Sequence, residues 1–161
     1  MKRALLLALP VLLLTPIASA SEFNVTFSDT FTEKLEEDYG LKEGEYLANE
    51  IREDLARYLA KAGLTVSQID VVIEDARPNK PTMKQLGDEL SLDYGRSIST
   101  GGMKLTLSAR DADKNVIASL TDDDFENDLR FASPTTWGDA NTASSRITRK
   151  FVKQIAALET R

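Results

Sequence analysis

The chain has 161 residues, a formal net charge of −6, and neither histidine nor cysteine. Without imidazole or thiol groups, His-based triads, cysteine nucleophiles, disulfides and His or Cys metal sites are excluded. Basic residues are interleaved with acidic ones along the sequence. The sequence therefore predicts no nucleic-acid partner and disfavours binding to anionic membranes, since both depend on clustered Lys and Arg.

The first twenty residues have the pattern of a cleaved secretory signal. Two basic residues precede the apolar run Ala4–Leu14, and Ala18-Ser19-Ala20 offers small residues to a signal peptidase. The run is about half the roughly 20 residues that a transmembrane helix needs, and Ser21 stands where a bacterial lipoprotein has its lipidated cysteine. We expect residues 1–20 to be a signal peptide and residues 21–161 to be one soluble periplasmic domain, without a transmembrane or lipid anchor.

The first part of this domain predicts the order strand, helix, strand. Apolar and polar residues alternate over residues 23–31, which indicates a half-buried strand, and the polar stretch 32–44 indicates a loop or a frayed helical turn. Residues 45–62 carry Leu and Ile at helical spacing, and Gly63 is placed to cap the helix. A second strand is expected over residues 67–76.

The second part predicts a hairpin and then a long helix. Thr82 is placed to cap a short helix, and a strand edge is expected around residues 97–100. The alternating stretches 103–109 and 116–120 flank turn-forming residues, which is typical of a β-hairpin. Helical spacing then runs from Thr136 to the end of the chain. The sequence thus predicts an α+β fold, with two main helices packed on one face of a mostly antiparallel sheet of about four strands.

Two acidic stretches resemble cation-binding sequences. The run Asp122–Asp128 could supply oxygen ligands to calcium, but charge at a strand end also prevents edge-to-edge pairing. Asp111–Asn115 opens like an EF-hand loop, yet Val116 stands where that loop needs glycine, and strands flank it where helices are required. We expect a solvated strand end and a hairpin turn, with no metal or cofactor, and cation binding by the acidic run stays open.

One polar segment follows the second strand and is poorly explained by packing. Two prolines stiffen it, because each favours extended backbone in the preceding residue. Rigid exposed loops are common contact surfaces, although a purely structural turn explains the same residues. The candidate partner-contact residues are Arg77, Pro78, Asn79, Lys80, Pro81 and Thr82.

Two stretches resemble signatures of known families. Residues 72–82 (VIEDARPNKPT) resemble a strand-to-loop signature of small, uncharacterised exported proteins of Gram-negative bacteria. Residues 136–140 (TWGDA), which lead to Phe151, are similar to the closing helix of several such families. In layout these families are similar to envelope accessory lipoproteins, small α/β modules that assist transport or assembly machines at the outer membrane. The resemblance implies an envelope location and no catalytic residues, and the missing lipidation cysteine departs from it.

Together these features predict a soluble periplasmic binding or accessory module without catalytic activity, with another envelope protein as the candidate partner. One alternative is a carboxylate-based or divalent-metal-dependent hydrolase, which the run Asp122–Asp128 motivates. A further alternative is an inhibitor or immunity-type protein, which small size and acidity allow. The ligand, the biological process and the oligomeric state stay open at the level of sequence.

Overall fold

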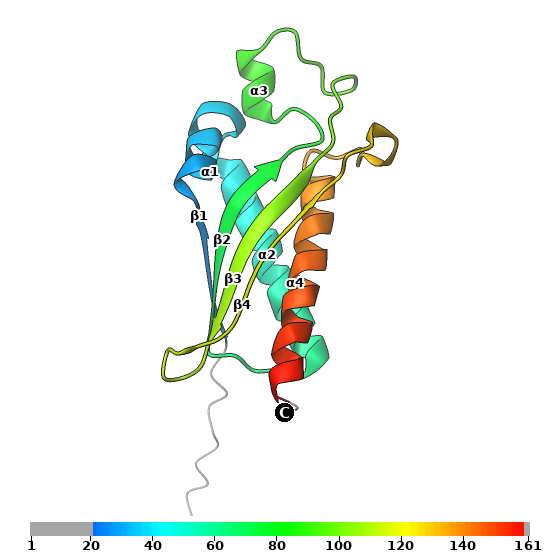
Figure 1. The fold of residues 1–161 in the computed structure, drawn as a ribbon. Coiled ribbons are helices and arrows are strands. Elements are labelled where there is room, and N and C mark those ends of the chain that lie inside the picture. The colour runs from blue at the N-terminus through cyan, green and yellow to red at the C-terminus, as the bar shows by residue number, and fades with distance from the viewer. Residues whose placement is uncertain (1–20, 160–161) are drawn as a thin grey trace, which may run out of the picture.

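The computed structural model describes residues 21–159, and the expected signal segment 1–20 lies outside the described residues. A four-stranded sheet carries two long helices on one of its faces (Figure 1). The strands and long helices, in chain order, are β1 (Glu22–Phe27), α2 (Leu41–Ala62), β2 (Gln68–Arg77), β3 (Gly102–Arg110), β4 (Val116–Phe125) and α4 (Gly138–Glu159). The short elements are α1 (Asp29–Lys34), the π-helical turn η1 (Leu35–Tyr39), α3 (Met83–Asp88) and the 3₁₀ turn η2 (Leu129–Phe131).

The spatial order of the strands is the order of the chain, β1-β2-β3-β4. β1 and β2 run parallel because the helical crossover through α2 joins them, whereas β2–β3 and β3–β4 are antiparallel. The predicted α+β fold, with two main helices on one face of a mostly antiparallel four-stranded sheet, is confirmed.

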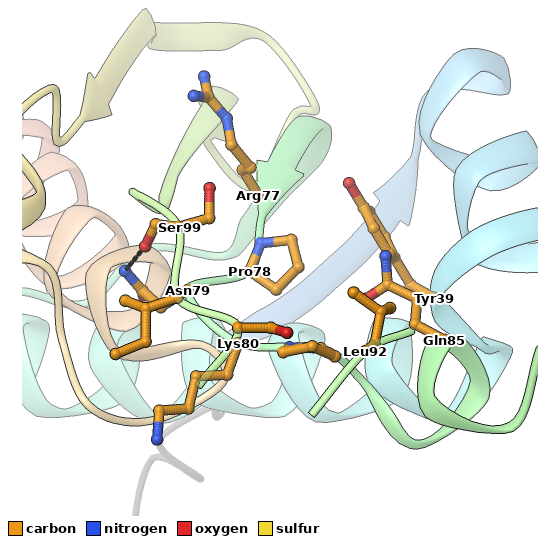
Figure 2. A pocket seen from close by; sticks show the side chains of 11 residues that line it. Tyr39, Arg77, Pro78, Asn79, Lys80, Gln85, Leu92 and Ser99 are labelled. Carbon is orange, nitrogen blue, oxygen red and sulfur yellow. Dashed lines mark hydrogen bonds between the residues drawn. The ribbon is translucent and has the colours of Figure 1, made fainter. Parts of the chain in front are cut away.

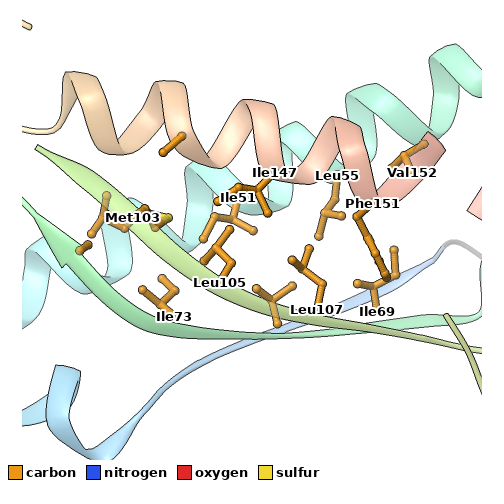
Figure 3. Close-up of a cluster of buried hydrophobic side chains, with 14 of the residues drawn as sticks. Ile51, Leu55, Ile69, Ile73, Met103, Leu105, Leu107, Ile147, Phe151 and Val152 are labelled. Carbon is orange, nitrogen blue, oxygen red and sulfur yellow. The ribbon is translucent and has the colours of Figure 1, made fainter. Parts of the chain in front are cut away.

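The core is a single apolar layer between the sheet and the helix pair (Figure 3). Strand alternation directs every second side chain of β2 and β3 at the helices, and the helical spacing of α2 and α4 supplies the facing side chains. The largest fully buried residues of this layer are Leu47, Ile51, Leu55, Ile69, Ile73, Met103, Leu105, Leu107, Ile147 and Phe151. A bulge between Ile73 and Asp75 shifts the alternation of β2 and turns Ala76 into the core.

The segment between the first strand and the long helix differs from the expectation. β1 ends at Phe27, not at residue 31, because the Ser28 hydroxyl accepts a hydrogen bond from the Phe31 backbone N–H (3.2 Å) and caps α1. Residues 32–44, expected to form a loop or a frayed helical turn, form regular helical structure through the end of α1, η1 and the start of α2, apart from Gly40. Phe31 and Leu35, four residues apart, are both buried by this helical path, and their burial outweighs the polar composition around them.

The expected strand edge around residues 97–100 is also wrong, because this stretch is irregular and β3 begins only at Gly102. The Ser99 N–H donates to the Asn79 carbonyl (2.7 Å), so its backbone is used by a loop and not by a sheet ladder. The hairpin of β3 and β4, the left-handed Gly63 after α2, and the Thr82 cap of α3 are confirmed. None of the helices within residues 21–159 combines the length and the apolar composition that a membrane span requires.

Gly102 provides a test of how tightly the hairpin is packed. Its φ is +150°, and a Cβ there would lie 2.4 Å from the Asp124 carbonyl oxygen. We expect Gly102→Ala to lower the free energy of unfolding by about 1–3 kcal/mol in urea denaturation, since backbone must move to make room. Gly87→Ala is the control, because a Cβ at Gly87 meets nothing within 4 Å. Equal stabilities of the two variants would contradict this packing.

Candidate functional site

The predicted contact segment 77–82 lies at the end of β2, but most of it is not exposed. Pro78, Asn79, Pro81 and Thr82 are buried, whereas Arg77 is exposed and Lys80 is partly exposed. The expectation of an exposed loop is therefore wrong for four of its six residues. The physical reason is that the backbone and side-chain polar groups of Asn79 and Thr82 find partners within the protein, so burial leaves them satisfied.

Asn79 joins three segments through its backbone and its amide. Its N–H donates to the Thr136 carbonyl (2.7 Å), and its carbonyl accepts from the Ser99 N–H (2.7 Å). Its side-chain oxygen accepts from the Asp139 N–H (2.9 Å). Its side-chain nitrogen donates to the Asp139 carboxylate and to the Ser99 carbonyl (3.2 Å). Asn79 is fully buried, and these contacts satisfy the hydrogen-bonding capacity of its amide.

Asp139 is the second half of this contact. Its carboxylate also accepts from the Gly101 N–H (3.1 Å) and the Ser133 N–H (3.1 Å), and it stands in the first turn of α4, where a negative charge complements the helix dipole. We call the contacts of Asn79 and Asp139 the Asn79–Asp139 latch. The latch joins the two stretches that resemble known families, residues 72–82 and 136–140, which the sequence alone does not place side by side.

A hollow of about 350 Å³ opens beside the latch (Figure 2). Tyr39, Gln85 and Leu92 lie on one side of it, and Asn79 and Ser99 lie on the other. The lining comes from η1, the end of β2, α3 and the irregular stretch before β3, and consists of Tyr39, Arg77, Pro78, Asn79, Lys80, Pro81, Gln85, Leu92, Ser97, Ile98 and Ser99. Five of the six predicted contact residues therefore line one hollow.

The lining of the hollow contains the cations Arg77 and Lys80 and no acidic residue. Both cations lie over aromatic rings: the Arg77 guanidinium is 4.9 Å from the Phe125 centroid, and the Lys80 ammonium is 4.8 Å from the Tyr94 centroid. Burial raises the pKa of Tyr39, so its phenol stays a hydrogen-bond donor at neutral pH. The lining can therefore bind a carboxylate or another small anion.

Exposed apolar side chains surround this end of the molecule. We define the loop end as residues 77–101 and 126–137, which project beyond the sheet on the same side (Figure 1). Its large apolar residues have exposed fractions far above those of a core, namely Met83 at 77%, Leu90 at 100%, Tyr94 at 46%, Ile98 at 49%, Leu129 at 61% and Phe131 at 70%. Apolar groups that cluster on a solvent-exposed surface and are bordered by polar groups are characteristic of protein–protein contacts.

The acidic side chains at the start of the run Asp122–Asp128 point to opposite faces of the sheet. β4 continues to Phe125, and its alternation turns Asp122 and Asp124 toward α4, where they pair with Lys150 (2.8 Å) and Arg146 (2.9 Å). Asp123 lies across from Lys104 on the other face. Within residues 21–159, no group of three or more His, Cys, Asp or Glu side chains is placed to hold a metal ion. The run contributes ion pairs between β4 and α4.

The turn expected at Asp111–Asn115 is confirmed. Asp111–Asn115 forms the β3–β4 turn, in which the Asp111 carboxylate accepts from the Asn115 N–H (2.9 Å) and Lys114 adopts a φ of 65°.

Trp137 lies immediately before α4. It is buried, its ring stands edge-on to Tyr39 (5.6 Å between centroids), and its indole N–H donates to Glu43 (2.6 Å).

A polar contact between α2 and α4 was missed by the sequence analysis. Asp54 is only 7% exposed, and its carboxylate accepts from the Ser144 hydroxyl (3.2 Å) and from Arg57. Beside it, the Tyr58 and Ser145 hydroxyls lie 2.6 Å apart at a hollow of about 440 Å³. A signal was present, since Asp54 stands three residues after Ile51, at a position where helical spacing places core residues.

This second cluster has features of an acid–base site but lacks others. The hydrogen bond from Ser145 lowers the pKa of Tyr58, and burial raises the pKa of Asp54. However, Ser145 lies inside α4, where backbone amides bond to carbonyls one turn earlier. No amide pair is therefore free beside its hydroxyl to stabilise an oxyanion. What the residues do in this structure is tie the two helices together.

No family model matches the chain, and no curated protein matches it. Among solved structures, a minor lipoprotein from Acinetobacter baumannii is 11% identical, with a TM-score of 0.39 and an alignment over 88% of this chain and 95% of that chain. A putative lipoprotein from Caulobacter crescentus is 12% identical, with a TM-score of 0.35 and an alignment over 89% of this chain and 90% of that chain. Both neighbours are lipoproteins of Gram-negative bacteria, whereas this chain has no cysteine.

We predict that removal of the Asn79 side chain from the Asn79–Asp139 latch lowers the stability of the fold. Asn79→Ala removes one donor to the partly buried Asp139 carboxylate and the acceptor of the Asp139 N–H, so we expect the free energy of unfolding to fall by about 1–3 kcal/mol in urea denaturation. Asn127→Ala is the control, because Asn127 is exposed and its amide makes one hydrogen bond, to Phe125. In the double variant with Asp139→Ala, the loss should be smaller than the sum of the two single losses. Additive losses would show that the two residues act independently.

Asp54 predicts a pH dependence with a defined sign. Folding raises the pKa of the Asp54 carboxyl, because burial disfavours its charged form. The stability that this shift contributes is therefore fully present below the pKa of Asp54 in the unfolded chain, about 3.9. It is lost as the pH rises through the raised pKa of the folded state. Asp54→Asn keeps an acceptor for Ser144 and removes the charge. Its melting temperature relative to wild type should therefore increase from pH 4 to pH 7. Glu45→Gln, which removes an exposed charge nearer the start of the same helix, is the control, and a parallel profile for both variants would contradict the assignment.

Proposed function

We propose that this chain is an exported, soluble binding module of the Gram-negative envelope that acts without catalysis, and that its loop end binds a protein partner. Its export follows from the predicted signal segment at residues 1–20. The single observation that carries the proposal is the loop end itself, where a hollow lined by Arg77 and Lys80 and several exposed apolar side chains occur at one end of the molecule, beside a backbone that the Asn79–Asp139 latch holds in place.

A fixed backbone favours binding because little conformational entropy is lost when the partner docks. The latch engages the end of β2, the stretch leading to β3 and the start of α4, so the hollow is bounded by segments that are mutually hydrogen-bonded. Flexible side chains on such a frame can adapt to the partner, while the frame keeps its shape.

The chemistry of the surface indicates the kind of partner. Arg77 and Lys80 suit a carboxylate, and Met83, Ile98 and Phe131 suit apolar side chains. A protein surface with an acidic residue among apolar neighbours meets both requirements. A small apolar metabolite would offer Arg77 and Lys80 no anionic group.

The absence of catalysis is proposed on chemical grounds. The chain contains no histidine and no cysteine, and the lining of the hollow has no aspartate or glutamate. General acid–base catalysis near neutral pH most often uses histidine or a carboxylate. The lining instead supplies fixed positive charge and hydrogen-bond donors, which are suited to recognition.

The proposal is tested by affinity capture from an envelope extract of the source bacterium, with the tagged chain as bait. We expect the double variant Met83→Asp/Phe131→Asp to retain at least about tenfold less of the captured protein, because it places charge where apolar contact is needed. Lys80→Glu should have the same effect through repulsion of the partner's carboxylate.

The matched control is Val116→Asp, since Val116 is 52% exposed and lies at the hairpin turn, away from the loop end. It places an aspartate at another exposed apolar position and should retain the partner as wild type does. Circular dichroism and melting temperature establish that all variants are folded. If the loop-end variants and Val116→Asp retain the same proteins in the same amounts, the loop end is not the binding surface.

A further inference from the structure

The sheet has two edges, and one of them has little to protect it. Within residues 21–159, β1 pairs with β2 alone and β4 pairs with β3 alone, so the outer side of each carries backbone groups without a strand partner. An unprotected edge is a template for the addition of another strand.

β4 is guarded along its length by α4. Arg146 and Lys150 form ion pairs with Asp124 and Asp122, and the Gln154 amide donates to the Ser119 carbonyl (3.2 Å). The pairing of β4 is also irregular near Val116. Charge, irregularity and covering side chains are the usual protections of an edge.

β1 has almost none of these protections. Its sequence, EFNVTF, contains no proline, lysine or arginine, and its register with β2 is regular throughout. Among the described residues, one side chain hydrogen-bonds to its outer backbone: the Arg52 Nε–H donates to the Phe23 carbonyl over a long 3.5 Å. A shallow hollow of about 450 Å³ lies along the strand and is lined by Phe23, Asn24, Val25, Thr26, Arg52 and Asp70.

The direction of the backbone groups identifies the residues that face outward. The Glu22 N–H donates to Ser67 and the Ser28 N–H donates to Ile73, each at 3.1 Å, so the even-numbered positions of β1 point their backbone groups at β2. Alternation then turns those of Phe23, Val25 and Phe27 outward. The side chains of these three residues are only half-buried against the core, so an added strand would also cover apolar surface.

We propose that the β1 edge is a self-association surface, on which the β1 strand of a second copy of this chain pairs antiparallel with Val25 opposite Val25. In this register Phe23 lies opposite Phe27 of the partner, so every outward-facing residue meets another and roughly six main-chain hydrogen bonds form. The result is a continuous eight-stranded sheet with both helix pairs on one face.

The choice of a second copy rests on self-complementarity. With the two-fold axis at Val25, Asn24 of one copy lies opposite Thr26 of the other on the polar face. Glu22 of one copy lies opposite Ser28 of the other. The only charged residue of the strand thus faces a hydroxyl and not its own copy. Apolar side chains meet apolar ones on one face, and polar side chains meet polar ones on the other.

The absence of cysteine from the chain allows a direct test. In the proposed register the Val25 Cα atoms are about 5.5 Å apart, within the range that a disulfide spans. Oxidation of Val25→Cys should therefore give a covalent dimer at protein concentrations near 10 μM. Thr121→Cys, an exposed position on the other edge strand, is the control and should stay monomeric.

Analytical ultracentrifugation of the full mature chain gives the second readout. Wild type should sediment as a dimer, and Val25→Pro should reduce the dimer fraction at least tenfold with an unchanged circular dichroism spectrum, because the lost N–H points away from β2. Val25→Lys repeats the test without altering the backbone. Met83→Asp/Phe131→Asp should still dimerise, which separates this proposal from that for the loop end.

Two results would overturn the proposal. One is a wild-type chain that sediments as a monomer up to about 100 μM while the Val25→Cys thiol stays reactive and uncrosslinked. The other is a dimer that persists in both Val25→Pro and Val25→Lys. A third result would also exclude the second copy. If wild type is monomeric and captures a different protein, and Val25→Pro no longer captures it, the β1 edge binds that protein.

Discussion

Burial on one face of a single sheet is the constraint on which the rest of this structure depends. The chain has no disulfide to hold it, so its stability comes from one apolar layer between four strands and two helices. The opposite face of the sheet is polar, with a Thr106–Thr121 hydroxyl pair and the Asp70–Arg110 ion pair on it. The ends of the strands and the edges of the sheet lie outside this layer.

The two proposed surfaces belong to these remaining parts. At the loop end, the Asn79–Asp139 latch lets an irregular backbone leave the sheet without unpaired buried groups, and it thereby fixes a hollow beside Arg77 and Lys80. At the β1 edge, the strand is regular and, within residues 21–159, is the outermost strand of the sheet. The first surface is rich in side-chain chemistry and the second in main-chain groups, so they suit different kinds of contact.

Several charged side chains of the described residues pair with one another across elements. Asp122 and Asp124 pair with α4, Asp75 pairs with Lys34 (2.8 Å), and Asp54 ties α2 to α4. Exposed pairs of this kind contribute little to stability, of the order of 0–1 kcal/mol each. Two of these pairs, those of Asp122 and Asp124, connect β4 to α4.

The sequence by itself determined the α+β class, the long helices and the β3–β4 hairpin, because periodicities of 3.6 and 2 depend only on residues near one another in the chain. It did not predict the helical path through Phe31 and Leu35, since packing at a distance overrode a polar composition. It pointed to residues 77–82 but not to their burial, which requires Asp139 from 60 residues away. Only the tertiary structure decided which side chains reach solvent and which edge of the sheet is free, because those properties depend on neighbours that are distant in sequence.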